Sequence, residues 1–200
     1  MITRFAPLAA FAAGALLLAA CGGSDSAAPT NSTVPAATED GSGAVGVAEF
    51  NDADVVFAQG MIPHHAQAIE MAALAADRSQ NPAILDLAQR IRGAQDPEIE
   101  LMRSWLDAWG HDEMAAEMEG MDHDMAGMMS DDHMAALTAA TGPAFDRMFT
   151  EMMIVHHQGA IDQAQTVLDD GADAEARALA EAIIAAQSAE IDEMQNLDLG

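Results

Sequence analysis

The chain has 200 residues, which allows one domain or two small ones. It carries 33 acidic residues against 7 basic ones, a formal net charge of −26, which argues against binding to nucleic acid or anionic lipid and favours cations. Tyr is absent and aromatic residues make up only 4%, which argues against a β-sandwich or β-barrel. The chain has one Cys, so an internal disulfide is excluded.

The amino-terminal residues resemble a targeting signal followed by a flexible linker. Residues 1–20 start with a single Arg and continue as an apolar stretch that is too short for a membrane span and typical of a signal peptide. The stretch ends at Cys21, which resembles the lipidation site of a bacterial lipoprotein; an ordinary secretory signal is the alternative. Residues 21–46 are rich in Ser, Ala, Pro, Thr and Gly and predict a flexible tether. We therefore expect an extracytoplasmic protein, periplasmic or on the outer cell surface, held to the membrane by lipid alone.

The remainder of the chain contains an internal duplication. Shifted by 92 residues, segment 54–69 lies over 146–161 without a gap, and the match continues from 87–102 to 179–194. This many identities at one offset define two repeats.

Each repeat predicts two helices. In repeat one, residues 47–110, apolar residues recur with a helical period, and Asp52 or Asp54 is the expected cap of the first helix. The second helix should begin at Asn81-Pro82 and end near residues 105–110.

Repeat two, residues 142–200, should turn at Asp170-Gly171 and then form a helix from about Asp173 to Leu197. Pro63 and Pro97 occur only in repeat one and are expected to kink a helix or, at Pro97, to restart it. Two hairpins that cannot bury their apolar faces alone predict an all-α, ferritin-like four-helix bundle, with residues 47–200 as one domain.

Two His-His pairs at matched positions in the repeats are the main candidate metal ligands. A Met lies one helical turn before each pair, and imidazole with thioether is a soft, neutral ligand set suited to copper, above all Cu(I). The alternative is a set of core residues whose rings bond to carbonyls or Gln. The candidate metal ligands are Met61, His64, His65, Met153, His156 and His157, with Asp54 and Asp146 on the same stripes as weaker candidates.

The second helix of each repeat adds a Gln, a Glu and a Met at spacing i, i+3, i+7, which places them on one face. They are either a solvated edge with Met as filler, or carboxylates and amides that hold a His ring, with the Met as a further ligand. These residues are Gln95, Glu98, Met102, Gln187, Glu190 and Met194.

Between the repeats lies a connector, residues 111–141, in which Met is the only large apolar residue as far as Ala136. Its spacing predicts a helical stripe that either covers the bundle or gathers several soft metal ions weakly. The stripe contains His111, Met114, Met118, Met121, Met125 and Met128, and His123, Met129, His133 and Met134 lie near it.

The pattern Asp-x-x-Phe-x-x-x-Met-Ile-x-His-His at 54–65 and 146–157, with Ala-Gln-x-x-Glu-Ile-x-x-Met at 94–102 and 186–194, resembles the domain-of-unknown-function 305 family. The resemblance covers about 51–197. It implies a ferritin-like helical bundle, secreted or lipid-anchored, and some members are periplasmic copper-binding proteins linked to copper tolerance. Here Pro63 and Ala66-Gln67 depart from the pattern, as does the absence of Trp-Leu at the carboxyl end.

The leading hypothesis is therefore a protein that binds copper and buffers it or passes it on, with affinity falling below about pH 6 as imidazoles protonate. No motif for a nucleophile or a phosphate loop is present, so we expect no catalytic residues. The alternatives are an oxidase of Cu(I) or Fe(II), and a structural or interaction lipoprotein whose His-Met face is core. The sequence leaves the delivery partner and the oligomeric state open.

Overall fold

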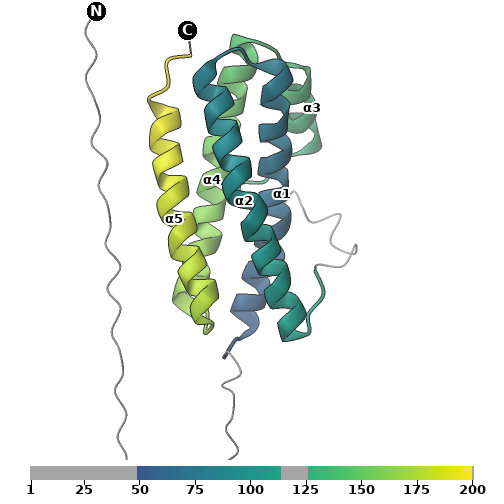
Figure 1. Cartoon of the computed structure of the whole chain (residues 1–200), viewed down its shortest axis with the longest axis vertical. Helices are drawn as coiled ribbons and strands as arrows, with labels where there is room; N and C mark the ends of the chain where they lie inside the picture. Colours follow the sequence, from purple (N-terminus) through teal and green to yellow (C-terminus); the bar gives the residue numbers. More distant parts are fainter. Residues whose placement is uncertain (1–48, 114–125, 200) are drawn as a thin grey trace, which may run out of the picture. The chain divides into compact units, whose positions relative to one another are not determined.

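The computed structural model describes residues 49–113 and 126–199, which belong to one compact unit, Ala44–Gly200. Four long helices pair as two antiparallel hairpins, and together they form a bundle (Figure 1). The predicted all-α fold is confirmed. None of the described helices is long and apolar enough to cross a membrane. The helices in chain order are α1 (Asp52–Arg78), α2 (Pro82–Trp109), α3 (Asp131–Ala139), α4 (Pro143–Asp170) and α5 (Ala174–Gln195).

The cap of helix α1 lies one residue before Asp52 and three before Asp54, the two predicted caps. Its cap is Asn51, whose side chain accepts hydrogen bonds from the N–H groups of Ala53 and Asp54. Asp54 returns the bond by accepting from the Asn51 N–H at 2.9 Å, so the expectation that an Asp caps this helix is wrong. Helix α2 begins as predicted, with Asn81 as its cap and a proline at the first helical position.

The two prolines do not divide their helices. α1 continues through Pro63 and α2 through Pro97, so the predicted restart at Pro97 is wrong. Pro97 is exposed, which lets water bond the carbonyl that lost its partner. The long apolar face of α2 keeps packing against the bundle on both sides of this position and holds the helix together.

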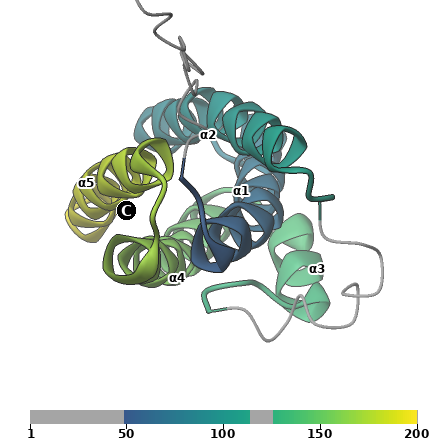
Figure 2. The same ribbon diagram turned by 90° about the horizontal axis from the view of Figure 1, so that it is seen from below.

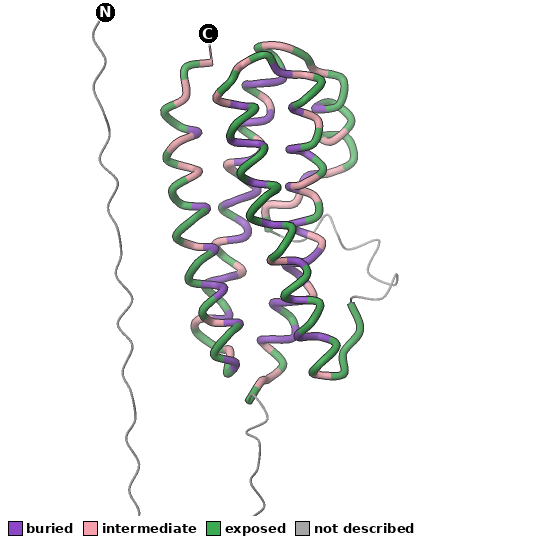
Figure 3. Tube along the Cα trace, viewed as in Figure 1, coloured by how far each residue is buried: buried purple, intermediate pink, exposed green. Residues whose placement is uncertain are grey.

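The hairpins meet along α1 and α4, while α2 and α5 touch at few points. Seen along the bundle, α3 lies outside α1 and α4, away from α2 and α5 (Figure 2). Buried residues line the inward faces of the four long helices (Figure 3).

The core divides into two apolar clusters at different heights. α1 contributes residues 55–62 to one cluster and 68–75 to the other, whereas α4, which runs the opposite way, contributes 160–167 to the first and 145–153 to the second. Both His-His pairs fall between these stretches, so the fold places all four imidazoles at one level of the bundle.

The connector differs from the predicted helix. Residues 111–113 and 126–130 are not helical, so the expected stripe is wrong at both of its described ends. Among the described residues of the connector, helix α3 starts after the cap Ser130, whose hydroxyl accepts from the His133 N–H at 3.3 Å.

Candidate metal centre

His64 from α1 and His156 from α4 meet at the middle of the bundle. Their ring centroids lie 3.8 Å apart, and the residues are 0% and 1% exposed. The Nδ1 atoms of both rings and Nε2 of His156 have no hydrogen-bond partner, while Nε2 of His64 lies 3.3 Å from the carbonyl oxygen of Ala126. Burial, helped by neighbouring histidines, lowers the pKa of His64 to about 3 and that of His156 well below its ordinary value. Both rings are therefore neutral and keep lone pairs free for a ligand.

The other histidine of each pair turns toward the second helix of its own hairpin. His65 Nε2 lies 2.7 Å from Oε2 of Glu98, and His157 Nε2 lies 2.8 Å from Oε2 of Glu190. A carboxylate only accepts, so each ring carries its N–H on Nε2. In the neutral ring the lone pair is then on Nδ1, which is buried and has no partner in either residue. Carboxylates hold metal-binding histidines in this way.

Four buried methionines lie in the two apolar clusters on either side of this level. Met61 and Met153 are completely buried and lie one turn before the histidines. Met102 belongs to the same apolar cluster as Met61, and Met194 to the same cluster as Met153, with exposures of 0% and 2%. The two repeats thus supply thioethers from both sides, and we name the four histidines with Met61 and Met153 the histidine centre.

Gln95 and Gln187 are buried, and the side-chain oxygen of each lacks a partner. Together with Glu98 and Glu190 they line a cavity of about 20 Å³ between α2 and α5, which is room for one water molecule. Every residue that lines this cavity has its duplicate in the other repeat, so the cavity lies where the two halves face each other.

The structure does not bring Asp54 and Asp146 to the histidines. Ten residues, or roughly 15 Å of helix, separate each Asp from the first histidine of its repeat. Oδ2 of Asp54 accepts hydrogen bonds from the N–H groups of Ala172 and Asp173 at 2.9 and 3.0 Å. Asp54 therefore ties the start of α1 to the turn before α5, which is a structural role.

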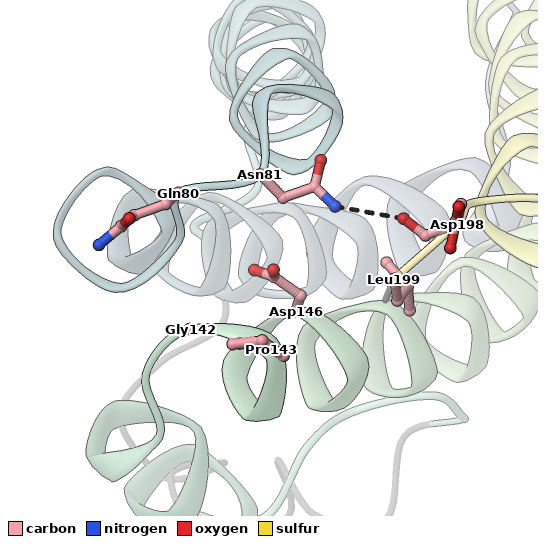
Figure 4. A pocket seen from close by; sticks show the side chains of 7 residues that line it. All are labelled: Gln80, Asn81, Gly142, Pro143, Asp146, Asp198 and Leu199. Carbon is pink, nitrogen blue, oxygen red and sulfur yellow. Dashed lines mark hydrogen bonds between the residues drawn. The ribbon is translucent and has the colours of Figure 1, made fainter.

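Asp146 is the duplicate of Asp54 but is not used in the same way. It is 3% exposed, and no hydrogen bond from the described residues reaches its side chain, whereas Oδ2 of Asp54 accepts from three backbone N–H groups. Oδ1 has no partner in either residue. The N–H of Asn81, which matches that of Asp173, donates instead to the hydroxyl of Ser79 at 3.1 Å. Asp146 lines a pocket of about 460 Å³ (Figure 4), together with Gln80, Asn81, Gly142, Pro143, Asp198 and Leu199.

This difference between the two repeats predicts unequal stability effects. Asp54→Ala should lower the free energy of unfolding by roughly 2–3 kcal/mol, because several N–H groups lose a charged acceptor. Asp146→Ala removes a buried oxygen without a partner and should cost less than about 1 kcal/mol. Urea unfolding of the two variants beside the unchanged chain measures both values, and equal losses would contradict the assignment.

Residues 126–129, here named the strap, cross the outside of α1 and α4 beside the histidine centre. Gln67 on α1 bonds to both backbone groups of Met129, donating to its carbonyl at 2.8 Å and accepting from its N–H at 2.7 Å. On α4, a Cβ at Gly159 would lie 2.0 Å from the carbonyl oxygen of Ala126, so only glycine allows the strap this close. Gln67 and Gly159 occupy matched positions, and their difference serves the strap. The repeat mismatch was visible in the sequence, but its meaning was missed.

The remaining candidates divide between the surface and the part of the chain that is not described. His111 is exposed and packs edge-on to Phe50, with ring centroids 6.1 Å apart, and Met128 is half-buried. Within the described ranges, no three or more His, Cys, Asp and Glu side chains are grouped to hold a metal ion. Cys21, Met114, Met118, Met121, His123 and Met125 lie outside the described residues.

An all-α bundle of two duplicated hairpins, with four imidazoles at one level, defines the structural class. The chain belongs to the DUF305 family, a domain of unknown function, whose model matches residues 54–198. No curated protein matches the chain.

Solved structures share this fold. A DUF305 fragment from Deinococcus radiodurans is 33% identical, with a TM-score of 0.64 over 72% of this chain and 94% of that one. A DUF305 protein from Streptomyces coelicolor is 29% identical, with a TM-score of 0.66 over 71% and 89%. CopM in its Cu(I)-bound form is 33% identical, with a TM-score of 0.60 over 71% and 92%, and CopM has also been solved with Cu(II) and with Ag.

Proposed function

We propose that this protein is a lipid-anchored, extracytoplasmic copper-binding protein that takes Cu(I) at the histidine centre and buffers it or passes it on. The observation that carries the proposal is the contact between His64 and His156, two buried imidazoles from different repeats with three ring nitrogens that lack partners. A buried polar atom without a partner costs about 1–3 kcal/mol, and a bound metal ion removes that cost.

The donor set decides which metal is favoured. Nδ1 of His65 and of His157 adds two further lone pairs, and Met61 and Met153 add thioethers in an apolar surrounding. Neutral imidazole and thioether favour Cu(I) over zinc, which prefers thiolates or carboxylates beside His, and over calcium, which takes oxygen. CopM, which shares the fold, binds copper and silver.

The proposed location follows from the amino-terminal residues. We expect a signal peptide over residues 1–20, lipidation at Cys21 and a tether to residue 46. Together these would hold the bundle outside the cytoplasm. We assign no catalytic residues, and no described observation favours oxidase activity over binding.

Anaerobic titration of the chain with Cu(I) against a chromophoric chelator tests the proposal. The variant in which all four paired histidines are Ala should lose affinity at least 100-fold, since several ligand bonds are removed. Equal affinity in the variant would move the metal to the connector. Failure of the unchanged chain to compete with the chelator would reject copper.

A further inference from the structure

A second group of soft donors lies on the surface between α3 and α4. There a pocket of about 240 Å³ is lined by Met129, His133, Glu151, Met152 and Val155. Four of these five residues carry a metal donor: two thioethers, one imidazole and one carboxylate. Met129 and His133 belong to the connector, whereas Glu151 and Met152 belong to none of the predicted ligand sets.

The fold holds the pocket together from three elements. The backbone of Met129 is fixed to α1 by its two hydrogen bonds with Gln67. Ser130 then caps α3 and sets His133 on the first turn of that helix. Met152 is on α4, one turn before His156, so the pocket lies beside the histidine centre but on the outside of the bundle.

Repeat one shows that this pocket is not a by-product of the duplication. The residues that match Glu151 and Met152 are Gln59 and Gly60, which offer neither a carboxylate nor a thioether. Gln59 donates instead to the carbonyl oxygen of Asp112 at 2.8 Å, which fixes the start of the connector. The donors are thus present only where the connector returns to the bundle.

Accessibility separates the pocket from the histidine centre. His133 and Glu151 are exposed and Met152 is half-buried, whereas the four paired histidines are at most 1% exposed. Met129 also lines the pocket but is only 6% exposed. A soft cation from solvent therefore reaches His133, Glu151 and Met152 without any opening of the bundle.

We propose that this pocket is a second, surface-accessible site for a soft univalent cation, Cu(I) or Ag(I), held by the thioethers of Met129 and Met152 and the imidazole of His133. Glu151 supplies negative charge beside the ion, and the net charge of −26 raises the local concentration of cations. The site goes beyond the proposed function, because it does not depend on ligation by the buried histidines.

Titration of the whole chain with Ag(I), followed by the NMR signals of 13C-labelled Met methyl groups, tests the site. Ag(I) is the probe because it has the ligand preferences of Cu(I) without its oxidation. The methyl signals of Met129 and Met152 should shift together. In a Met152→Leu/His133→Gln variant, the Ag(I) concentration that half-shifts Met129 should rise at least tenfold. Leu has nearly the volume of Met, so the fold is kept, and the melting temperature verifies this.

Two further variants separate this site from the histidine centre. His64→Leu/His156→Leu should leave both pocket signals responsive to Ag(I), even if the histidine centre binds nothing. Met148→Leu, a change on α4 outside the pocket, should leave them unaltered. Pocket signals that stay still while the chain binds Ag(I), that respond equally in the Met152→Leu/His133→Gln variant, or that depend on His64 and His156 would each overturn the proposal.

Discussion

Replacing His64 and His156 together by Leu is expected to abolish tight Cu(I) binding while leaving the metal-free bundle at least as stable as before. The two rings bury three nitrogens that have no partner, and each costs about 1–3 kcal/mol. Leu is close to His in volume and has no polar atom, so the substitution removes this cost without opening a large cavity. We expect the free energy of unfolding to rise by roughly 1–3 kcal/mol.

This variant is informative because Cu(I) affinity should fall while the stability of the metal-free chain should rise. If the histidines were an ordinary part of the core, the variant would lose stability and metal affinity would be unaffected. Urea unfolding of the metal-free chains gives the stability, and competition with a Cu(I) chelator gives the affinity. A less stable variant with unchanged affinity would favour the structural interpretation.

Acid is expected to destabilise the metal-free protein through the same two residues. Burial lowers the pKa of His64 to about 3 and that of His156 well below 6.5, so between these pH values the unfolded chain binds more protons than the folded chain. The stability that depends on each neutral ring is therefore complete above pH 6.5. For His64 it is lost as the pH falls toward 3, and for His156 it is likewise lost as the pH falls below 6.5. The loss is at most about 1.4 kcal/mol per pH unit for each ring that stays neutral.

The His64→Leu/His156→Leu variant is the control for this pH dependence. It keeps all 33 acidic residues, whose mutual repulsion also changes with pH, so the difference between the two chains isolates the imidazoles. Urea unfolding at several pH values between 7 and 4 should show a gap that widens as the pH falls. Parallel curves would contradict the burial of neutral rings.

The internal duplication made much of the fold predictable. Two helices per repeat, the start of α2 at Asn81 and the all-α bundle follow from periodicity, capping residues and the offset between the repeats. The contacts of Glu98 and Glu190 with histidine rings could also be predicted, because both residues share a helical face with other matched polar residues.

What the sequence could not supply was the packing of the hairpins. Neighbouring histidines on a helix point about 100° apart, and only the packing of α1 on α4 shows that His64 meets His156 while His65 turns to α2. Asp54 shares a stripe with His65 along the helix, yet the antiparallel arrangement places it at the turn before α5.

The connector posed a different difficulty. A Met spacing of three and four residues is compatible with a helix, but Gly120 and Gly127 weaken it, and the strap passes in a turn directly over Gly159. Gly127 has a φ of +83°, a left-handed conformation that favours glycine and does not continue a helix.

X-ray absorption at the copper edge, on the anaerobic chain loaded with one equivalent of Cu(I), tests the central claim most directly. Ligation in the histidine centre predicts at least two imidazole nitrogens around the ion, with or without sulfur, and loss of the nitrogen signal in the His64→Leu/His156→Leu variant. A spectrum with sulfur neighbours alone, identical in both chains, would contradict the account and place the ion among the methionines of the connector.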